Sequence, residues 1–393
     1  MSATTRTQVG IIGAGPAGLL LAHLLAQRGI DSVVLEARSR DYVEARLRAG
    51  VLEQPTVDAL VASGAGERLL REGLRHEGIY LQSAGVRQRV DFPSLCGQSV
   101  WVYGQSEVVK DLIALRLAAG LPLHFESGDV AVHDVESDRP ALTWTSADGA
   151  AQRLECDVVA ACDGFHGIGR PAVPESLRTS WKRTYPFSWL GILAQVPPSS
   201  DELVYAHHRD GFAMHSLRSP QVSRLYLQVP VDEDLAAWSD DRIWDALSTR
   251  LGTDGWTLQT GPITDRSITP MRSFVSTPMR HGNLFLAGDA AHIVPPTGAK
   301  GLNLAAADVQ VLAPALAALL ADGDPRPAAE YSATAERRVW RATHFSWWMT
   351  QMLHTHGDAF DSRLQETALQ SIATSPGLAT HLAENYTGLP VGG

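Results

Sequence analysis

A glycine-rich turn directly after a short apolar run constrains the fold of this chain more than any other feature. Residues 8–12 form the apolar run, and Gly13, Gly15 and Gly18 follow it with G-x-G-x-x-G spacing. Ala17 and the leucines after it recur with helical periodicity. Glycines serve such a turn because the strand-to-helix connection is tight, a diphosphate approaches the backbone closely, and helix packs closely on strand. The pattern predicts a Rossmann-like α/β fold with a dinucleotide diphosphate at the helix N-terminus.

Three acidic positions fit one large dinucleotide. A second apolar run, residues 32–35, ends in Glu36, where a carboxylate accepts hydrogen bonds from the adenosine ribose. Asp163 ends the strand-like run 154–162, and Asp289 follows the apolar run 283–287. Carboxylates at strand tips accept hydrogen bonds from sugar or ribityl hydroxyls, and a following helix N-terminus stabilises a negatively charged ring edge. These positions predict non-covalently bound FAD, whereas the first segment alone is also compatible with an ordinary glycine-rich turn.

Composition and charge exclude several classes of function. The chain has 393 residues, 45% of them hydrophobic and 19% charged, with a formal charge of −10. This length predicts two domains, and this composition predicts a soluble globular protein. The negative charge argues against binding to nucleic acid, which favours clustered Lys and Arg. The first strand begins by residue 8, so we expect no signal peptide. The longest apolar helical stretch, residues 311–321, contains Pro314 and is too short for a membrane span, so we expect a cytoplasmic protein.

The three cysteines indicate neither a disulfide framework nor a metal site. Cys96, Cys156 and Cys162 are odd in number, and no pair has C-x-x-C spacing. We expect them to be small core residues and expect no metal cofactor.

The hydrophobic pattern divides the chain into three parts. Residues 1–178 predict an FAD-binding domain with a short substrate-domain insertion near 76–98. Residues 179–270 predict a β-sheet substrate-binding domain, because residues 187–230 alternate between apolar and polar positions. Residues 271–393 predict a return to the FAD-binding domain and a C-terminal helical region. Its expected helices cover 302–321, 328–353 and 361–372, before a turn-rich tail at 385–390.

The alternating segment predicts a sheet face that suits a polar pocket. Side chains two residues apart on a strand share a face, and the residues grouped in this way are Tyr205, Phe212, Met214, Ser216, Arg218, Arg224 and Tyr226. A face that carries tyrosine, serine and arginine is a poor core but a good pocket wall. The alternatives are that the tyrosines are ordinary core or surface residues and that Arg218 and Arg224 form a surface pair.

Seven segments carry a resemblance that runs nearly end to end. They are ARLRAGVLEQ at 45–54, VYGQSEV at 102–108, CDGFHGIGR at 162–170, YPFSWLG at 185–191, GDAAHIVPPTGAKGLNLAA at 288–306, FSWWMT at 345–350 and AENYTGLP at 383–390. Together they resemble the class A flavoprotein aromatic monooxygenases. The resemblance implies FAD-dependent hydroxylation of 4-hydroxybenzoate by O2 and NAD(P)H to 3,4-dihydroxybenzoate, through a flavin C4a-hydroperoxide and without a metal.

The resemblance also assigns roles in substrate binding and catalysis. Arg218 would bind the benzoate carboxylate through two parallel N–H bonds, together with Ser216 and Tyr226, and Met214 would line the ring. Hydroxylation needs an electron-rich phenolate, so the family's proton relay would run through groups that both donate and accept hydrogen bonds. The residues matching the relay and its surroundings are Tyr205, Tyr386 and His76, with the Pro296 carbonyl beside the substrate and Lys300 as a nearby positive charge.

Further positions match the family's cofactor contacts. The FAD contacts would include Arg46, Arg48, Gln105, Asp289, Gly301, Leu302 and Asn303, and Arg224 would help to place the flavin. The NAD(P)H contacts would be Arg38, Tyr42, Arg46, His166 and Arg272. Segment 37–42 slightly favours NADH, with NADPH also accepted, although Arg38 and Arg40 could bind a 2′-phosphate. Two departures from the family are Met214 in place of leucine and Gly169 in place of serine.

The sequence leaves two alternative functions open. The same chemistry on 4-aminobenzoate or a dihydroxybenzoate would need the same cofactor motifs. A non-catalytic nucleotide-fold binding protein would be colourless when purified, whereas a flavoprotein is yellow. The resemblance further implies a homodimer, with residues 330–355 as part of the contact.

Overall fold

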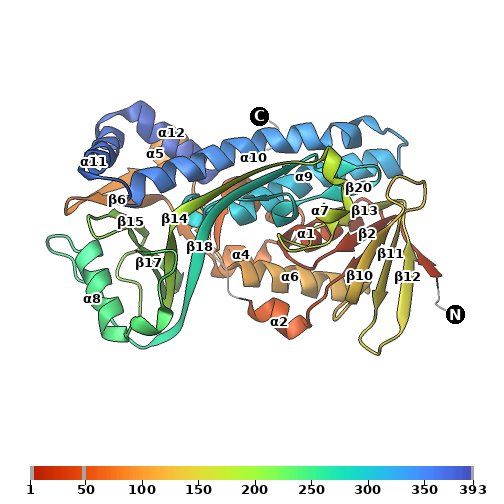
Figure 1. Cartoon of the computed structure of the whole chain (residues 1–393), viewed down its shortest axis with the longest axis horizontal. Coiled ribbons are helices and arrows are strands. Elements are labelled where there is room, and N and C mark those ends of the chain that lie inside the picture. The colour runs from red at the N-terminus through yellow and green to blue at the C-terminus, as the bar shows by residue number, and fades with distance from the viewer. Residues whose placement is uncertain (1–3, 47–49, 391–393) are drawn as a thin grey trace.

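Two long strands and one long helix connect the halves of the computed structural model, which describes residues 4–46 and 50–390. The strands are β14, Thr179–Ala194, and β18, Ile263–Thr277, which pair in antiparallel fashion along most of their length. The helix is α10, Arg326–Leu353. Figure 1 shows these elements running between a parallel sheet on the right and an antiparallel sheet on the left.

The first half contains a six-stranded sheet in the order β19-β20-β13-β2-β3-β9. All its pairs are parallel except β19 with β20. Its strands are β2 Val9–Ile12, β3 Ser32–Leu35, β9 Leu123–His124, β13 Val158–Ala161, β19 Arg280–His281 and β20 Leu284–Leu286. The helices α1 Pro16–Ala26, α6 Gln105–Ala118 and α9 Gly301–Leu320 share one hydrophobic core with it. This burial explains why the central strands are apolar runs without alternation.

A four-stranded sheet packs against the same core and corrects one prediction. Its order is β1-β12-β11-β10, with bounds Thr4–Arg6, Ala151–Glu155, Ala141–Thr145 and Gly128–His133. Residues 154–162 were expected as one strand, but they are the end of β12 and the whole of β13. The break lies at Cys156 and Asp157, whose N–H groups donate to the carbonyls of Pro140 and Gln8. The chain changes sheets there without a glycine or proline to signal the turn.

The second half is an eight-stranded sheet in the order β21-β18-β14-β17-β16-β15-β6-β7. The bounds not yet given are β6 Gly78–Ser83, β7 Val86–Asp91, β15 Leu203–His207, β16 Ala213–Ser219, β17 Val222–Val229 and β21 His292–Ile293. Alternate residues enter two separate cores: Tyr205 and Met214 lie in one, whereas Val204 and Ala213 lie in the other. The predicted alternation is therefore confirmed, and the sheet also uses β6, β7 and strand residues beyond position 270.

Shorter elements join these sheets. The three-stranded sheet β4-β8-β5 contains Val51–Glu53, Val100–Val102 and Leu74–His76. The remaining helices of the first 260 residues are α2 Arg40–Ala45, α3 Gln54–Ala62, α4 Glu67–Glu72, α5 Phe92–Cys96, α7 Gly169–Ala172 and α8 Asp240–Leu251, with 3₁₀ turns η1 Glu175–Leu177 and η2 Leu235–Ala237. Further on, η3 Gly288–Ala290 and η4 Pro296–Gly298 precede α9.

The C-terminal region is helical, as predicted, with one addition. Helices α9, α10 and α11, Ala359–Thr374, match the three predicted helices within a few residues. The prediction of a turn-rich tail was wrong, because α12, Pro376–Thr387, includes Asn385 and Tyr386. Pro376 occupies the first turn, where its missing N–H costs nothing, and Leu382, Ala383 and Tyr386 bury one face of the helix. Gly388, with a φ of 99°, follows the helix end.

Helix α9 corrects the expectation that every apolar helical stretch is too short to cross a membrane. Among the described residues it is one helix, Gly301–Leu320, that is long and apolar enough to do so. Most of it is buried in the protein, where it packs against α1 and α10, and it contains the buried polar residues Asn303 and Asp308.

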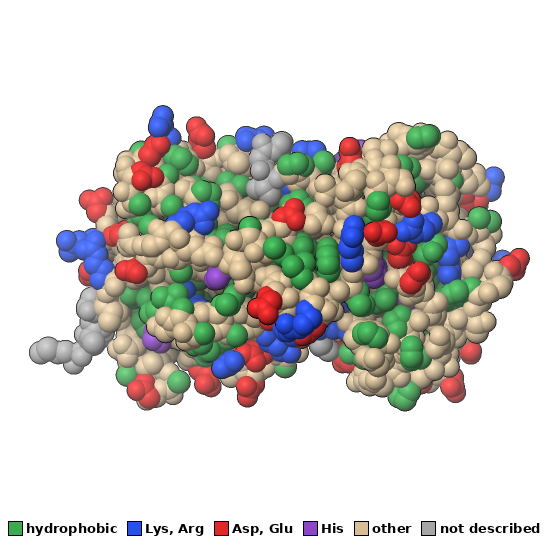
Figure 2. All heavy atoms as spheres, turned by 180° about the vertical axis from the view of Figure 1, so that it is seen from behind, with side chains coloured by type: hydrophobic (Ala, Val, Ile, Leu, Met, Phe, Trp, Pro, Cys, Tyr) green, Lys and Arg blue, Asp and Glu red, His purple; other side chains and the backbone are tan. Residues whose placement is uncertain are grey.

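Acidic and basic side chains are interspersed over the face shown in Figure 2, without a continuous basic stripe there.

Candidate active site

The glycine-rich turn leaves space for a ligand at one of its three glycines. An added Cβ would lie 2.5 Å from the Cys162 carbonyl oxygen at Gly13 and 2.0 Å from the Gly13 carbonyl oxygen at Gly18. At Gly15 an added Cβ would meet nothing within 4 Å. Gly13 also has a φ of +98°, which favours glycine. Gly13 and Gly18 therefore allow strand and helix to pack, and Gly15 borders open space at the start of α1.

The carboxylates predicted to meet the dinucleotide also order the protein around it. Glu36 accepts hydrogen bonds from the N–H groups of Ala14, at 2.8 Å, and Arg38, at 2.9 Å. It thereby joins the ends of β2 and β3. Asp163 accepts from the Gly169 N–H at 2.8 Å, and its other carboxylate oxygen is buried without a hydrogen-bond partner among the described residues.

Gly169 has a steric reason in this chain. A Cβ at this position would lie 2.1 Å from the Ala161 Cβ, so α7 could not approach β13 as it does. The departure from serine thus accompanies close packing behind the Asp163 loop.

The three cysteines are free thiols. Cys162 and Cys156 are buried, and Cys96 is half-buried.

The third segment is anchored by a buried ion pair. His292 Nε2 lies 2.7 Å from Asp308 Oδ2, which also accepts from the Gly288 N–H at 2.8 Å. Burial lowers the pKa of His292, but Asp308 outweighs this effect and the net pKa is raised. The pair fixes the turn that presents Asp289, which is exposed, and Gly301 follows at the start of α9 with open space at its missing Cβ.

Lys300 and Asn303 connect this segment to β4. Lys300 donates to Glu53 Oε1 at 2.6 Å, to the Tyr386 carbonyl at 3.2 Å and to the Asn385 carbonyl. Burial lowers the pKa of Lys300 despite the attraction of Glu53. Asn303 accepts from the Glu53 N–H at 2.9 Å, and its amide donates to the carbonyls of Val51 and Ala299. Its polar atoms are thus engaged by the protein.

Tyr205 and Tyr386 meet although they are far apart in sequence. Their hydroxyl oxygens are 2.6 Å apart, and both side chains are buried. Burial, followed by the neighbouring Tyr386, raises the pKa of Tyr205 well above its ordinary value. Burial also raises the pKa of Tyr386. The pair therefore stays protonated near neutral pH, and each hydroxyl can donate one proton and accept another.

Among the described residues, His76 makes no hydrogen bond to the tyrosine pair. It lies in β5, 2% exposed, and both ring nitrogens lack a hydrogen-bond partner among the described residues. Burial lowers its pKa to about 4, although Glu202 and Asp201 act in the opposite direction. The ring is therefore neutral at pH 7 and has two free nitrogen atoms for a water or a hydroxyl.

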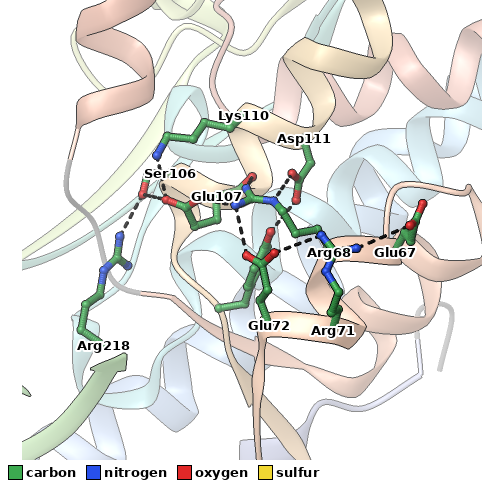
Figure 3. A network of polar contacts seen from close by, with 10 residues as sticks. Glu67, Arg68, Arg71, Glu72, Ser106, Glu107, Lys110, Asp111 and Arg218 are labelled. Carbon is green, nitrogen blue, oxygen red and sulfur yellow. Dashed lines mark hydrogen bonds and ion pairs between the residues drawn. The ribbon is translucent and has the colours of Figure 1, made fainter. Parts of the chain in front are cut away.

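The predicted substrate-binding residues share one face of β16 and β17. Met214 lies opposite Tyr226, and Ser216 lies opposite Arg224. The Ser216 hydroxyl donates to the Arg224 carbonyl at 3.1 Å, and the Arg224 guanidinium lies 5.3 Å from the centre of the Tyr226 ring. Arg218, also in β16, extends toward Ser106 of α6, as Figure 3 shows. Pro296, in η4, begins the turn before Lys300.

The predicted NAD(P)H residues form two separate exposed groups. Arg38 lies over the ring of Tyr42 at 5.4 Å, and Arg46 is the residue that follows α2. Arg272 lies over the ring of Phe165 at 4.1 Å, next to the exposed His166. Two predicted FAD contacts are half-buried: Gln105 is the first residue of α6, and Leu302 is the second residue of α9. Arg48 lies outside the described residues.

Several residues of the site were not predicted from the sequence. Glu53 binds Lys300, Ser106 binds Arg218, and His354 stacks on the Trp189 ring at a centroid distance of 5.8 Å. His354 accepts from the Trp189 indole N–H at 2.6 Å, and burial lowers its pKa to about 3. Glu53 and Ser106 lie within segments that carried the resemblance, which was the available signal for them. His354 lies outside those segments.

Comparison with known proteins identifies the family. Residues 6–346 match the family model of the FAD binding domain. The chain is 48% identical over 391 residues to the p-hydroxybenzoate hydroxylase of Acinetobacter baylyi. This match covers 98% of this chain and 96% of that relative. This chain belongs to the class A flavoprotein aromatic monooxygenases. A more distant relative, the 3-amino-4-hydroxybenzoate 2-monooxygenase of Streptomyces platensis, is 27% identical, and the match covers 83% of each protein.

Solved structures show the same fold at low identity. The crystal structure of the p-nitrophenol 4-monooxygenase PnpA from Pseudomonas putida DLL-E4 has a TM-score of 0.84 at 20% identity, with 99% of this chain and 100% of that chain covered. As a flavoprotein monooxygenase, the protein binds FAD and uses NAD(P)H, O2 and an aromatic substrate. The open space at Gly15 and Gly301 and the unpartnered Asp163 oxygen fit a long, polar cofactor.

Proposed function

We propose that this monooxygenase converts 4-hydroxybenzoate to 3,4-dihydroxybenzoate. The observation that carries the proposal is the hydrogen-bonded pair Tyr205 and Tyr386, in the same core as Met214 and Tyr226. In the proposed complex, Tyr205 would offer a hydrogen bond to the substrate phenol, and Arg218 would bind the carboxylate at the other end of the ring. The p-hydroxybenzoate hydroxylase relative supports the same substrate. Bound FAD would supply the activation of dioxygen.

The protein's own groups would prepare the substrate for hydroxylation. Arg218, with Ser216 and Tyr226, would hold the carboxylate and so fix the orientation of the ring. Tyr205 would accept the proton of the substrate phenol while its own hydroxyl donates a proton to Tyr386. Tyr386 would in turn donate a proton, through an intervening water, to His76. A free phenol titrates near pH 10, so each unit by which the site lowers its pKa needs about 1.4 kcal/mol of selective stabilisation.

The remaining assignments complete the proposal. The flavin would be held or placed by Gly13, Gly15, Ala17, Gly18, Glu36, Arg46, Arg48, Gln105, Asp163, Arg224, Asp289, Gly301, Leu302 and Asn303. Lys300, with its buried positive charge, would favour anionic states of the bound ring, and the Pro296 carbonyl would border the substrate. Arg38, Tyr42, Arg46, His166 and Arg272 would meet the reduced nicotinamide coenzyme, with NADH slightly preferred over NADPH.

We further propose a cytoplasmic homodimer. Trp181 and Trp340 are 44% and 40% exposed, and their rings touch at a centroid distance of 5.2 Å. An exposed aromatic pair beside α10 suits burial against a second copy. Measurement of the molecular mass in solution by light scattering, for the wild type and Trp340→Glu, would test this assignment.

Coenzyme oxidation with product identification tests the proposed function. The purified yellow protein is given NADH or NADPH, with and without 4-hydroxybenzoate, and the product is identified by mass spectrometry. We expect oxidation to be strongly stimulated by 4-hydroxybenzoate and to yield 3,4-dihydroxybenzoate. Stronger stimulation of coenzyme oxidation by 4-aminobenzoate or a dihydroxybenzoate would assign that compound as the substrate instead. A colourless protein without coenzyme oxidation would contradict the proposal.

A further inference from the structure

The guanidinium of Arg218 lies directly against the backbone of Gly104. An added Cβ at Gly104 would be 2.1 Å from Arg218 Nη1 and 2.5 Å from its Cζ. The Gly104 backbone has a φ of −56° and a ψ of 138°, which any residue can adopt. The missing side chain of Gly104 therefore leaves the space that the guanidinium fills, and a Cβ there would force the guanidinium to move.

Ser106 fixes the same guanidinium from the side. Arg218 Nη2 donates to the Ser106 hydroxyl oxygen at 2.9 Å, and the serine is 4% exposed. The hydroxyl in turn points its hydrogen toward Glu107 Oε1, at 3.4 Å. This arrangement leaves an oxygen lone pair for Arg218.

Glu107 is itself held by two cations. Arg68, from α4, donates to Glu107 Oε2 at 2.7 Å, and Lys110 donates to Glu107 Oε1 at 2.9 Å. Figure 3 shows a continuous series of polar contacts from Arg68 through Glu107 and Ser106 to Arg218. These contacts join β16 of the antiparallel sheet to α4 and α6, which belong to the first half of the molecule.

We propose that Gly104 and Ser106 form the seat that positions Arg218, and that they thereby determine the preference for a carboxylate substrate. The inference rests on the proposed function, in which Arg218 binds the benzoate carboxylate. Bidentate binding requires the planar guanidinium in one orientation. Gly104 presents a surface on which the plane can lie, and Ser106 uses one donor while the remaining donors stay available. Gln105, between them, is a predicted flavin contact, so one helix turn would align substrate and cofactor.

Ligand selectivity of the FAD-loaded enzyme tests the seat. Dissociation constants are measured for 4-hydroxybenzoate and for its neutral analogue 4-hydroxybenzamide from the change in flavin absorbance. We expect Ser106→Ala to weaken binding of the acid about five- to twentyfold, because a hydrogen bond to a charged group is lost, and binding of the amide less than twofold. Gly104→Ala should weaken binding of the acid more, since the guanidinium must move, and Ser106→Thr should restore most of it.

Matched variants separate a local effect from general damage. Ser63→Ala removes another buried hydroxyl, which donates to its own helix, and Gly377→Ala adds a Cβ where nothing lies within 4 Å. Both should leave the ratio of the two dissociation constants unchanged. Equal weakening of acid and amide in Ser106→Ala and Gly104→Ala, or no weakening, would overturn the seat.

Arg218→Met distinguishes failure of the seat from failure of the proposed function. If this variant binds 4-hydroxybenzoate as tightly as the wild type, Arg218 is not the carboxylate anchor, and both the anchor assignment and the seat fail. The conversion of 4-hydroxybenzoate itself fails only if the wild type does not form 3,4-dihydroxybenzoate. If Arg218→Met loses the acid while Ser106→Ala and Gly104→Ala retain it, the anchor stands and the seat alone is wrong.

Discussion

The glycine-rich turn and the substrate face are built in different ways. The turn lies within residues 13–18 and uses backbone shape, since its glycines differ in what an added Cβ would meet. The substrate face uses side chains whose contacts join Tyr205 to Tyr386 across 181 positions and Arg218 to Ser106 across 112 positions. A local backbone motif leaves a clear mark in the sequence, whereas a site assembled across sheets leaves only its separate parts.

The largest effect is expected where the turn is most tightly packed. Gly18→Ala should destabilise the protein by about 3 kcal/mol or more and abolish FAD retention, because its Cβ would lie 2.0 Å from the Gly13 carbonyl oxygen. Gly15→Ala is the control: its Cβ meets no protein atom, so the apoprotein should unfold at the same denaturant concentration while FAD binding weakens. Equal stability of the two apoproteins would contradict the difference between the glycines.

A substitution in the substrate face should change chemistry and spare the fold. Tyr205→Phe removes the hydroxyl that meets Tyr386 at 2.6 Å. We expect substrate binding to persist, hydroxylated product per coenzyme oxidised to fall by about tenfold to a hundredfold, and hydrogen peroxide to rise, since phenolate formation loses its partner. Product yield and peroxide are measured together. An unchanged yield would remove Tyr205 from the proposed role.

Buried histidines should respond to acid differently when a carboxylate is bound, as Asp308 is to His292. Burial lowers the pKa of His354 to about 3 and of His215 to about 4, so the unfolded chain takes up protons below pH 6.5 that the folded chain does not. Stability should therefore fall from pH 7 to pH 5, by about 2 kcal/mol for each such histidine. His292, whose pKa is raised, contributes stability that is present in acid and lost as the pH rises through its folded pKa.

Denaturant unfolding at pH 7 and pH 5 measures this contrast. His354→Gln should reduce the difference in unfolding free energy between the two pH values by about 2 kcal/mol, whatever its effect at pH 7. His292→Gln should not reduce that difference. A His354→Gln protein with the wild-type pH dependence would show that this histidine is not held neutral.

The smallest effect concerns the exposed coenzyme residues. Arg38→Ala should raise the KM for NADPH by no more than about tenfold and that for NADH less, because an exposed arginine contributes little to binding. Steady-state kinetics with both coenzymes decide this. A larger loss with NADH than with NADPH would exclude contact between Arg38 and a 2′-phosphate.

The sequence predicts the fold well where short periodic patterns act locally. The turn at Gly13, the alternating faces of β16 and β17 and helices α9 to α11 follow from spacing. The break at Cys156 and the helix around Tyr386 do not, because tertiary hydrogen bonds end β12 and tertiary packing stabilises α12. Residue types indicated Arg218 as a candidate anchor. Its contact with Ser106 depends on how two distant elements meet, which no local pattern encodes.

The ribbon formed by β14 and β18 limits how the two halves can be separated. Its hydrogen bonds run from Thr179 opposite Thr277 to Ala194 opposite Ile263, so no flexible linker divides the molecule there. The antiparallel sheet also recruits β6 and β7 from early in the chain and β21 from late in it. A segment of residues 179–277 transferred into a related protein would therefore bring sheet edges whose hydrogen-bonding groups lack their partners. Exchange of substrate specificity between relatives thus requires substitution of individual side chains rather than transfer of whole segments.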